Sequence, residues 1–120
     1  MRLLAVIILA CYCVPAMAAE KELSGEEITD LLPTIIATGK NSRQTFTKIG
    51  ATTYWDNGRK ILGARETFGR WRVQNNLYCS QWPPSDAWAC YRVVTDSSKK
   101  SLVWIGMSGN RTMNQFEHKE

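Results

Sequence analysis

The chain has 120 residues and a formal net charge of +4, from 15 lysines and arginines against 11 aspartates and glutamates. A chain of this length forms one small domain rather than two, and its basic excess is too mild and too scattered for a nucleic-acid-binding protein. We therefore expect no nucleic-acid partner.

Residues 1–18 have the three zones of a cleavable secretory signal peptide. A basic start at Arg2 precedes an apolar run, and the small residues Ala16 and Ala18 occupy the positions that signal peptidase reads. The apolar run is shorter than the roughly 20 residues that a membrane-spanning helix needs. We expect cleavage near Ala18, a periplasmic or secreted protein without a membrane span, and a single β-rich domain over 19–120.

A rival interpretation places a lipid anchor on Cys11, because the residues before it loosely resemble a lipoprotein box. This cysteine comes very early in the chain, and the better cleavage site at Ala18 lies just downstream. We therefore favour cleavage at Ala18 over lipidation at Cys11.

The two cysteines of the mature chain are Cys79 and Cys90. An even number of cysteines in an exported domain predicts a disulfide, and a hairpin register that places the two opposite each other satisfies its geometry. A metal site is the competing use of paired cysteines, but it needs further ligands, and the only histidine, His118, lies in a charged tail. We expect a Cys79–Cys90 disulfide, no metal and no cofactor.

The mature chain begins with a loose lead-in at 19–23, which a short amphipathic helix follows. Ser24 and Glu27 have the spacing of a capping box, and Pro33 ends the helix. The apolar residues between them recur at helical spacing, at Ile28, Leu31 and Leu32.

From about Thr45 onward the residues become β-branched and aromatic, with turn signals at intervals of roughly 8–12 residues. Asn57-Gly58 is the strongest of the turn signals. Because the connections are short, we expect a mainly β fold with one disulfide: the helix, then an antiparallel meander of about 6–8 strands that closes into a small barrel or half-barrel. The predicted strands are 46–49, 52–55, 60–66, 68–74, 77–82, 88–95, 102–107 and 112–116, with Asn75-Asn76 as the turn between 68–74 and 77–82.

Five tryptophans are many for a chain of this size. Trp71 and Trp104 lie in the middle of predicted strands among apolar neighbours, which predicts that both belong to the core.

Two further tryptophans, Trp82 and Trp88, flank the loop 83–86 at the tip of the cysteine hairpin, where burial normally fades. Packing that braces the loop and an exposed binding surface are equal alternatives for them. The second alternative depends on the enrichment of Trp, Tyr and Arg at interfaces. The candidate binding surface comprises Tyr78, Trp82, Trp88, Arg72 and Arg92.

No constellation of side chains indicates an enzyme. A disulfide removes both thiols as nucleophiles, and His118 is too near the chain end to be ordered as a base. Asp56 and Glu66 flank one hairpin, but a turn residue and a solvated strand end explain them better. We expect a non-enzymatic protein with no catalytic residue.

Three motifs in the mature chain resemble those of a group of small exported proteobacterial domains of unknown function. The resemblance covers most of the mature chain, and the hairpin motif is its most specific part. It implies a periplasmic domain and carries no activity. The motifs are Leu23-Ser24-Gly25-Glu26-Glu27-Ile28, Gly69-Arg70-Trp71-Arg72-Val73, and Tyr78-Cys79-Ser80-Gln81-Trp82 closed by Trp88-Ala89-Cys90-Tyr91.

Our leading functional hypothesis is a non-enzymatic binding module, an accessory or inhibitor of an envelope protein that uses the Trp82–Trp88 hairpin. The alternative is a small-ligand or saccharide binder that uses the barrel interior, and the third is an envelope enzyme. Exposed tryptophans at the hairpin favour the first, and a strongly shifted carboxylate pair in a cleft favours the third. The second is favoured by a cavity lined by Trp55, Trp71 or Trp104.

Overall fold

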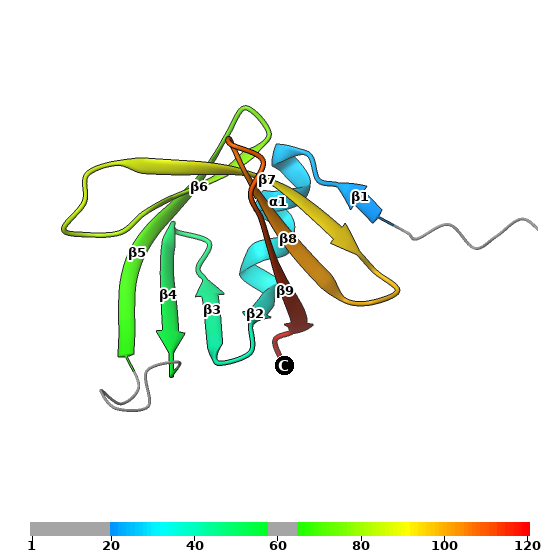
Figure 1. Ribbon diagram of the computed structural model, residues 1–120, viewed down its shortest axis with the longest axis horizontal. Helices are drawn as coiled ribbons and strands as arrows, with labels where there is room; N and C mark the ends of the chain where they lie inside the picture. The colour runs from blue at the N-terminus through cyan, green and yellow to red at the C-terminus, as the bar shows by residue number, and fades with distance from the viewer. Residues whose placement is uncertain (1–19, 58–64) are drawn as a thin grey trace, which may run out of the picture.

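The computed structural model describes residues 20–57 and 65–120 and shows an antiparallel β-barrel with one short helix (Figure 1). The helix α1 spans Gly25–Leu31 and continues into a 3-10 turn at Leu32–Thr34. The strands are β1 Glu20–Glu22, β2 Ile35–Thr38, β3 Ser42–Phe46, β4 Ala51–Asp56, β5 Arg65–Gln74, β6 Leu77–Gln81, β7 Trp88–Asp96, β8 Ser101–Gly106 and β9 Arg111–His118.

Strands β2 to β9 form a closed barrel of eight strands, in which each strand pairs with its neighbours in the chain. The barrel closes where β2 pairs with β9 and Ile36 lies opposite Glu117. All of these pairings are antiparallel, so the predicted meander that closes into a barrel is confirmed. Strand β1 lies outside this ring and pairs with the second half of β7.

The helix covers the end of the barrel at which the turn between β5 and β6 lies. Its capping box forms as predicted: the Glu27 amide donates to the Ser24 hydroxyl, and the Ser24 amide donates to the Glu27 carboxylate. The amide of Gly25 donates to the side chain of Asn76 in the β5–β6 turn at 2.8 Å. Because Ile28 is fully buried in the barrel core, this end of the barrel is filled. No helix in the described residues is long and apolar enough to cross a membrane.

A layer of aromatic side chains crosses the middle of the barrel. The ring of Phe46 meets three other rings edge-on, with centroid distances of 5.8 Å to Trp71, 5.8 Å to Tyr78 and 6.2 Å to Trp104. Edge-to-face pairs of this kind stabilise a core beyond the area that they bury. Trp71 and Trp104 are both buried, so the prediction that they are core residues is confirmed.

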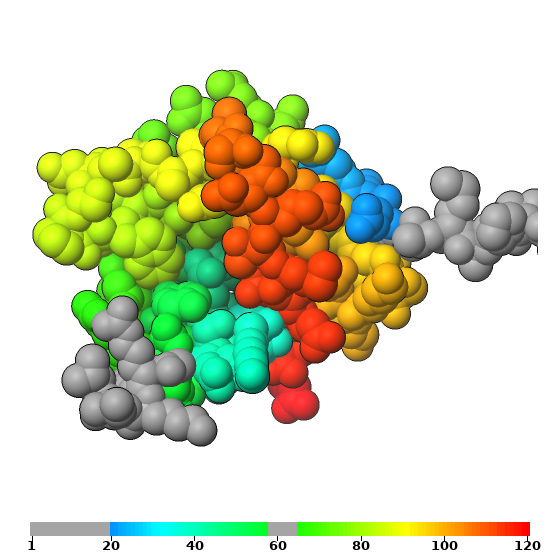
Figure 2. Space-filling view, viewed as in Figure 1, coloured from blue at the N-terminus to red at the C-terminus, as the bar shows by residue number. Residues whose placement is uncertain are grey.

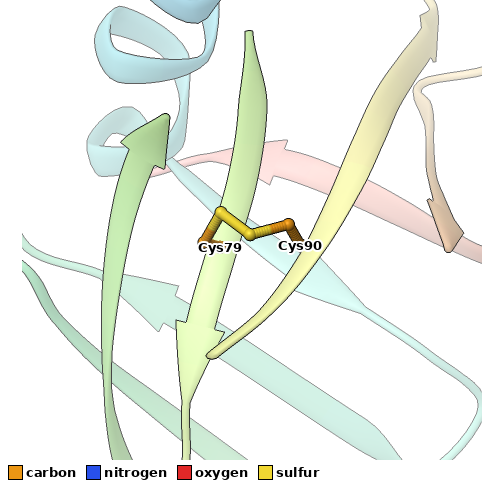
Figure 3. The surroundings of a disulfide bond; sticks show 2 residues. All are labelled: Cys79 and Cys90. Atoms are coloured by element: carbon orange, nitrogen blue, oxygen red, sulfur yellow. A yellow bond between two sulfur atoms is a disulfide. The ribbon is translucent and has the colours of Figure 1, made fainter. Parts of the chain in front are cut away.

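The disulfide joins the neighbouring strands β6 and β7 (Figure 3). Cys79 lies directly opposite Cys90, and the neighbouring pair is Tyr78 with Tyr91, as the cysteine register predicts. The predicted disulfide is therefore confirmed. The adjacent turn at Asn75 and Asn76 is also where the sequence places it.

The predicted lead-in at 19–23 is wrong over Glu20–Glu22, which pair with Val94–Asp96 of β7. Their side chains are all exposed, so the strand is made by backbone hydrogen bonds and leaves no hydrophobic pattern.

The predicted strand at 46–49 is also displaced. Strand β3 ends at Phe46, and Gly50, with a φ of +90°, supplies the left-handed residue of the turn that follows. Strand β2 was not predicted, because its short apolar run directly follows Pro33 and the helix. Residues 58 and 59 of the predicted turn at 56–59, and residues 60–64 of the predicted strand 60–66, lie outside the described residues.

Candidate functional site

The end of the barrel away from α1 holds a cavity of about 370 Å³. Figure 2 shows the molecule hollowed here, between the orange-red β9 and the teal and green β3 and β4, below the yellow-green β6–β7 hairpin. Because side chains alternate across a strand, each strand from β3 to β9 contributes one or two inward-pointing residues. The lining residues are Gln44, Tyr54, Thr67, Tyr78, Ser80, Trp82, Tyr91, Trp104, Thr112 and Asn114.

The lining of the cavity is half aromatic and half hydroxyl or amide. None of the lining residues in the described part of the chain carries a charge. A charged group that entered this cavity would lose its hydration without meeting a counter-charge, which is strongly unfavourable. The volume lies at the small end of the range for ligand pockets. The cavity therefore suits a small uncharged molecule.

Tyr78 and Trp104 form the floor of the cavity. Their rings stack with centroids 4.4 Å apart and planes 25° from parallel, and Tyr91 also stacks with Tyr78, with centroids 6.1 Å apart. Tyr78 is only 3% exposed, and this burial raises the pKa of its hydroxyl to about 12, although hydrogen bonds with Ser80 and Gln44 oppose the shift. The floor is therefore a packed and neutral aromatic surface.

Trp82 forms part of the wall at the mouth of the cavity. Its indole Nε1 donates to the hydroxyl of Ser80 at 3.1 Å, and its ring meets Tyr54 edge-on with centroids 6.2 Å apart. The ring also lies directly over Gly69, where an added Cβ would come within 2.7 Å of it. Gly69 therefore makes room for this indole, which explains a glycine in the middle of β5.

A buried hydrogen-bond network connects three strands beside this floor. The side-chain amide of Gln44 in β3 donates to the hydroxyls of Thr52 in β4 and Tyr78 in β6, both at 3.0 Å. The Thr52 hydroxyl in turn donates to the carbonyl of Thr45 at 2.9 Å. Gln44 is thus both a structural link across the barrel and part of the cavity wall.

The five residues of the candidate binding surface do not form one surface. Tyr78 lies inside the barrel and Trp82 at its mouth, whereas the other three lie on the outer face. There the guanidinium carbon of Arg72 lies 4.0 Å from the centre of a Trp88 ring, and Arg92 forms an ion pair with Glu22 of β1. Side-chain alternation along β5, β6 and β7 separates the two groups.

The small-ligand hypothesis is favoured by a cavity lined by Trp55, Trp71 or Trp104. Of these three, Trp104 lines the cavity. Trp71 lies deeper in the core, where its Nε1 donates to the carbonyl of Thr47 at 2.9 Å. Trp55 lies on the outer face of β4, between Arg43 of β3 and Glu66 of β5.

Most of the other lining residues were not singled out from the sequence. The sequence feature that could have indicated them is polarity at inward-facing positions. Gln44, Thr67 and Asn114 occupy such positions, where a filled barrel would carry aliphatic residues.

The carboxylates do not form a catalytic pair. The register of β4 and β5 places Asp56 opposite Arg65 and Trp55 opposite Glu66, so the two acids of this hairpin lie on different faces of the sheet. Within 20–57 and 65–120, no three His, Cys, Asp or Glu side chains gather where they would hold a metal ion.

No protein-family model, no curated protein and no solved structure matches this chain. The geometry of the cavity is therefore the main guide to function.

Proposed function

We propose that this protein binds a small uncharged molecule in the open end of its barrel. The observation that carries this proposal is the cavity of about 370 Å³, lined by neutral polar and aromatic side chains. A barrel that needed only to be stable would fill this space, because interiors are normally packed to the density of organic crystals. The cavity leaves room for on the order of ten water molecules, which a ligand would displace.

The residues inside the barrel support small-molecule binding better than the hairpin residues support protein docking. A protein-docking platform made of the five candidate residues needs Tyr78 on the outside, and Tyr78 is buried. On the outer face, Trp88 is half-buried beneath Arg72 rather than presented as a free ring.

The disulfide supports the further proposal that the protein acts outside the cytoplasm. Bonds such as Cys79–Cys90 form and persist in oxidising compartments, including the bacterial periplasm. The cavity would then receive a ligand of the cell envelope or of the medium.

Two neighbouring residues of β9 give a matched test of the cavity. Thr112 lines the cavity and lies opposite Trp104, whereas the next residue, Met113, faces outward and is 70% exposed. Thr112→Trp should fill the mouth and weaken binding of the neutral dye N-phenylnaphthylamine by about tenfold or more, which corresponds to about 1.4 kcal/mol. Met113→Trp adds the same ring outside and should leave the affinity unchanged. Dye fluorescence titration measures both, and equal affinities in the two variants would contradict the proposal.

A further inference from the structure

The buried side-chain amide of Gln44 has a fixed orientation in the cavity wall. The Thr52 hydroxyl has one hydrogen and donates it in a hydrogen bond to the carbonyl of Thr45. Toward Gln44 this hydroxyl can therefore act only as an acceptor. The amide must therefore present its nitrogen to Thr52, and the second proton on that nitrogen goes to the hydroxyl of Tyr78. Both donors of the amide are used inside the protein.

The amide oxygen of Gln44 is left over. It has no hydrogen-bond partner among the described residues, although the side chain is only 9% exposed. In the same part of the chain, no fully buried side-chain nitrogen or oxygen lacks a partner. Oε1 is therefore not fully buried, and the open space beside the Gln44 side chain is the cavity that it lines. The cavity thus contains a positioned hydrogen-bond acceptor.

This acceptor restricts the chemistry of the ligand. A molecule that removes water from Oε1 must return an N–H or O–H donor, or it loses the hydrogen bond that the water made. The remaining non-aromatic polar lining consists of the hydroxyls of Thr67, Ser80 and Thr112 and the amide of Asn114, which bind donors and acceptors alike. The aromatic lining, in turn, favours a ligand with an apolar face.

A neutral saccharide ring combines these properties. Its C–H face packs against aromatic rings, its hydroxyl groups at the edge donate and accept, and it carries no charge to desolvate. We infer that the ligand is a neutral saccharide, one of whose hydroxyls donates to Oε1 of Gln44. This inference deepens the proposed function and rests on it. A purely aromatic molecule would fill the same space but leave Oε1 without a donor.

The wild-type protein tests the ligand class without risk to folding. Glucose, galactose, N-acetylglucosamine and their disaccharides are titrated by calorimetry, and each binder is compared with its fully O-methylated analogue, which keeps the ring and the acceptors but has no donors. We expect at least one sugar to bind and its methylated form to bind about tenfold more weakly or worse. Equal affinities for the two forms would overturn the inference.

Dye binding distinguishes a failure of the saccharide inference from a failure of the proposed function. If N-phenylnaphthylamine binds in the cavity and no sugar binds or displaces it, the saccharide inference fails while the proposed function stands. If neither the dye nor any sugar binds, both fail.

The role of Gln44 is tested by Gln44→Leu, with the outer-face variant Met113→Trp as a control that should leave sugar and dye affinity unchanged. Gln44→Leu should weaken sugar binding by about tenfold or more and leave dye affinity within about twofold. Parallel losses for sugar and dye would instead indicate a collapsed cavity and contradict the specific role. Near-ultraviolet circular dichroism reports whether the variant keeps its aromatic packing.

Monodeoxy sugars provide a second measurement if Gln44→Leu does not fold. Each analogue lacks one hydroxyl and is titrated into the wild-type protein. Loss of one particular hydroxyl should weaken binding about tenfold, because the group that donates to Oε1 is then absent. If all monodeoxy analogues bind as well as the parent sugar, Oε1 is not the acceptor.

Discussion

Tyr78 lies at the boundary between the aromatic core and the cavity. Its ring stacks on Trp104, while its hydroxyl accepts a hydrogen bond from the side-chain amide of Gln44. Burial holds this hydroxyl in its neutral form, with a pKa raised from 10.0 to about 12. A residue that shapes the floor of the cavity is therefore also coupled to the stability of the whole barrel.

The pKa of Tyr78 predicts how stability depends on pH. The folded state binds the phenolic proton more tightly than the unfolded chain does, so this contribution is complete below pH 10 and is lost as pH rises toward 12. A shift of this size corresponds to about 2–3 kcal/mol of unfolding free energy. Urea unfolding at a series of pH values should show the decline, and tyrosinate absorbance should show Tyr78 ionising late.

The variant Tyr78→Phe is the control for this pH dependence. It keeps the stacked ring but removes the ionisable group, so the decline in stability above pH 10 should be smaller than in the wild type. An unchanged decline would assign the effect to other groups.

Among the elements, the β6–β7 hairpin is the one with a covalent constraint. The bond between Cys79 and Cys90 closes a loop with a sequence separation of 11. The chain-entropy relation assigns such a loop ~3 kcal/mol of stability, which acts on the unfolded state.

The double variant Cys79→Ala/Cys90→Ala should therefore lose ~3 kcal/mol of unfolding free energy in urea. Because the loss arises in the unfolded chain, the register of Tyr78 with Tyr91 should survive in the folded protein. Wild-type protein with a reducing agent should show the same decrease, and the reducing agent should not affect the variant. A variant as stable as the oxidised wild type would contradict this account.

The sequence predicted those elements that turn residues or side-chain patterns mark. Asn75-Asn76 delimits β5 and β6, and Ser24 with Glu27 starts α1, so these were found. Strand β1 has only charged, exposed side chains, and nothing local indicates that it pairs with a strand more than 70 positions away.

The cavity was less predictable than the fold for a related physical reason. The cysteines set the register of β6 against β7, and so predicted that Tyr78 pairs with Tyr91. They do not show which face is interior, because aromatic residues lie on both faces, with Tyr78 inside and Trp88 outside. Gln44 takes part in the site through the closed barrel, which brings β3 beside residues of β6 and β9.

At the scale of the whole molecule, we propose that the chain is exported and cleaved. The chain 1–120 expressed in a Gram-negative bacterium should give a periplasmic protein. Its intact mass should match a chain that begins at Ala19 and contains the Cys79–Cys90 bond. Cys11→Ser should leave this mass and location unchanged, since the proposed cleavage removes Cys11. A lipid-modified product, or an uncleaved chain in the cytoplasm, would contradict the proposal.

The pairing of β2 with β9 also has a consequence for how the molecule forms. Neighbouring strands of the meander can pair soon after both are available, but the barrel closes only when β2 pairs with β9, which is far from it in the sequence. Such long-range pairing raises the contact order and slows folding. The chain loses the entropy of a large loop before the hydrogen bonds and side-chain contacts between the two strands can compensate for that loss. Strand β9 is therefore needed to complete the barrel. A chain with this topology stays open until β9 is available to pair with β2, and an open chain is the state that a protein must keep while it is threaded through a translocation channel.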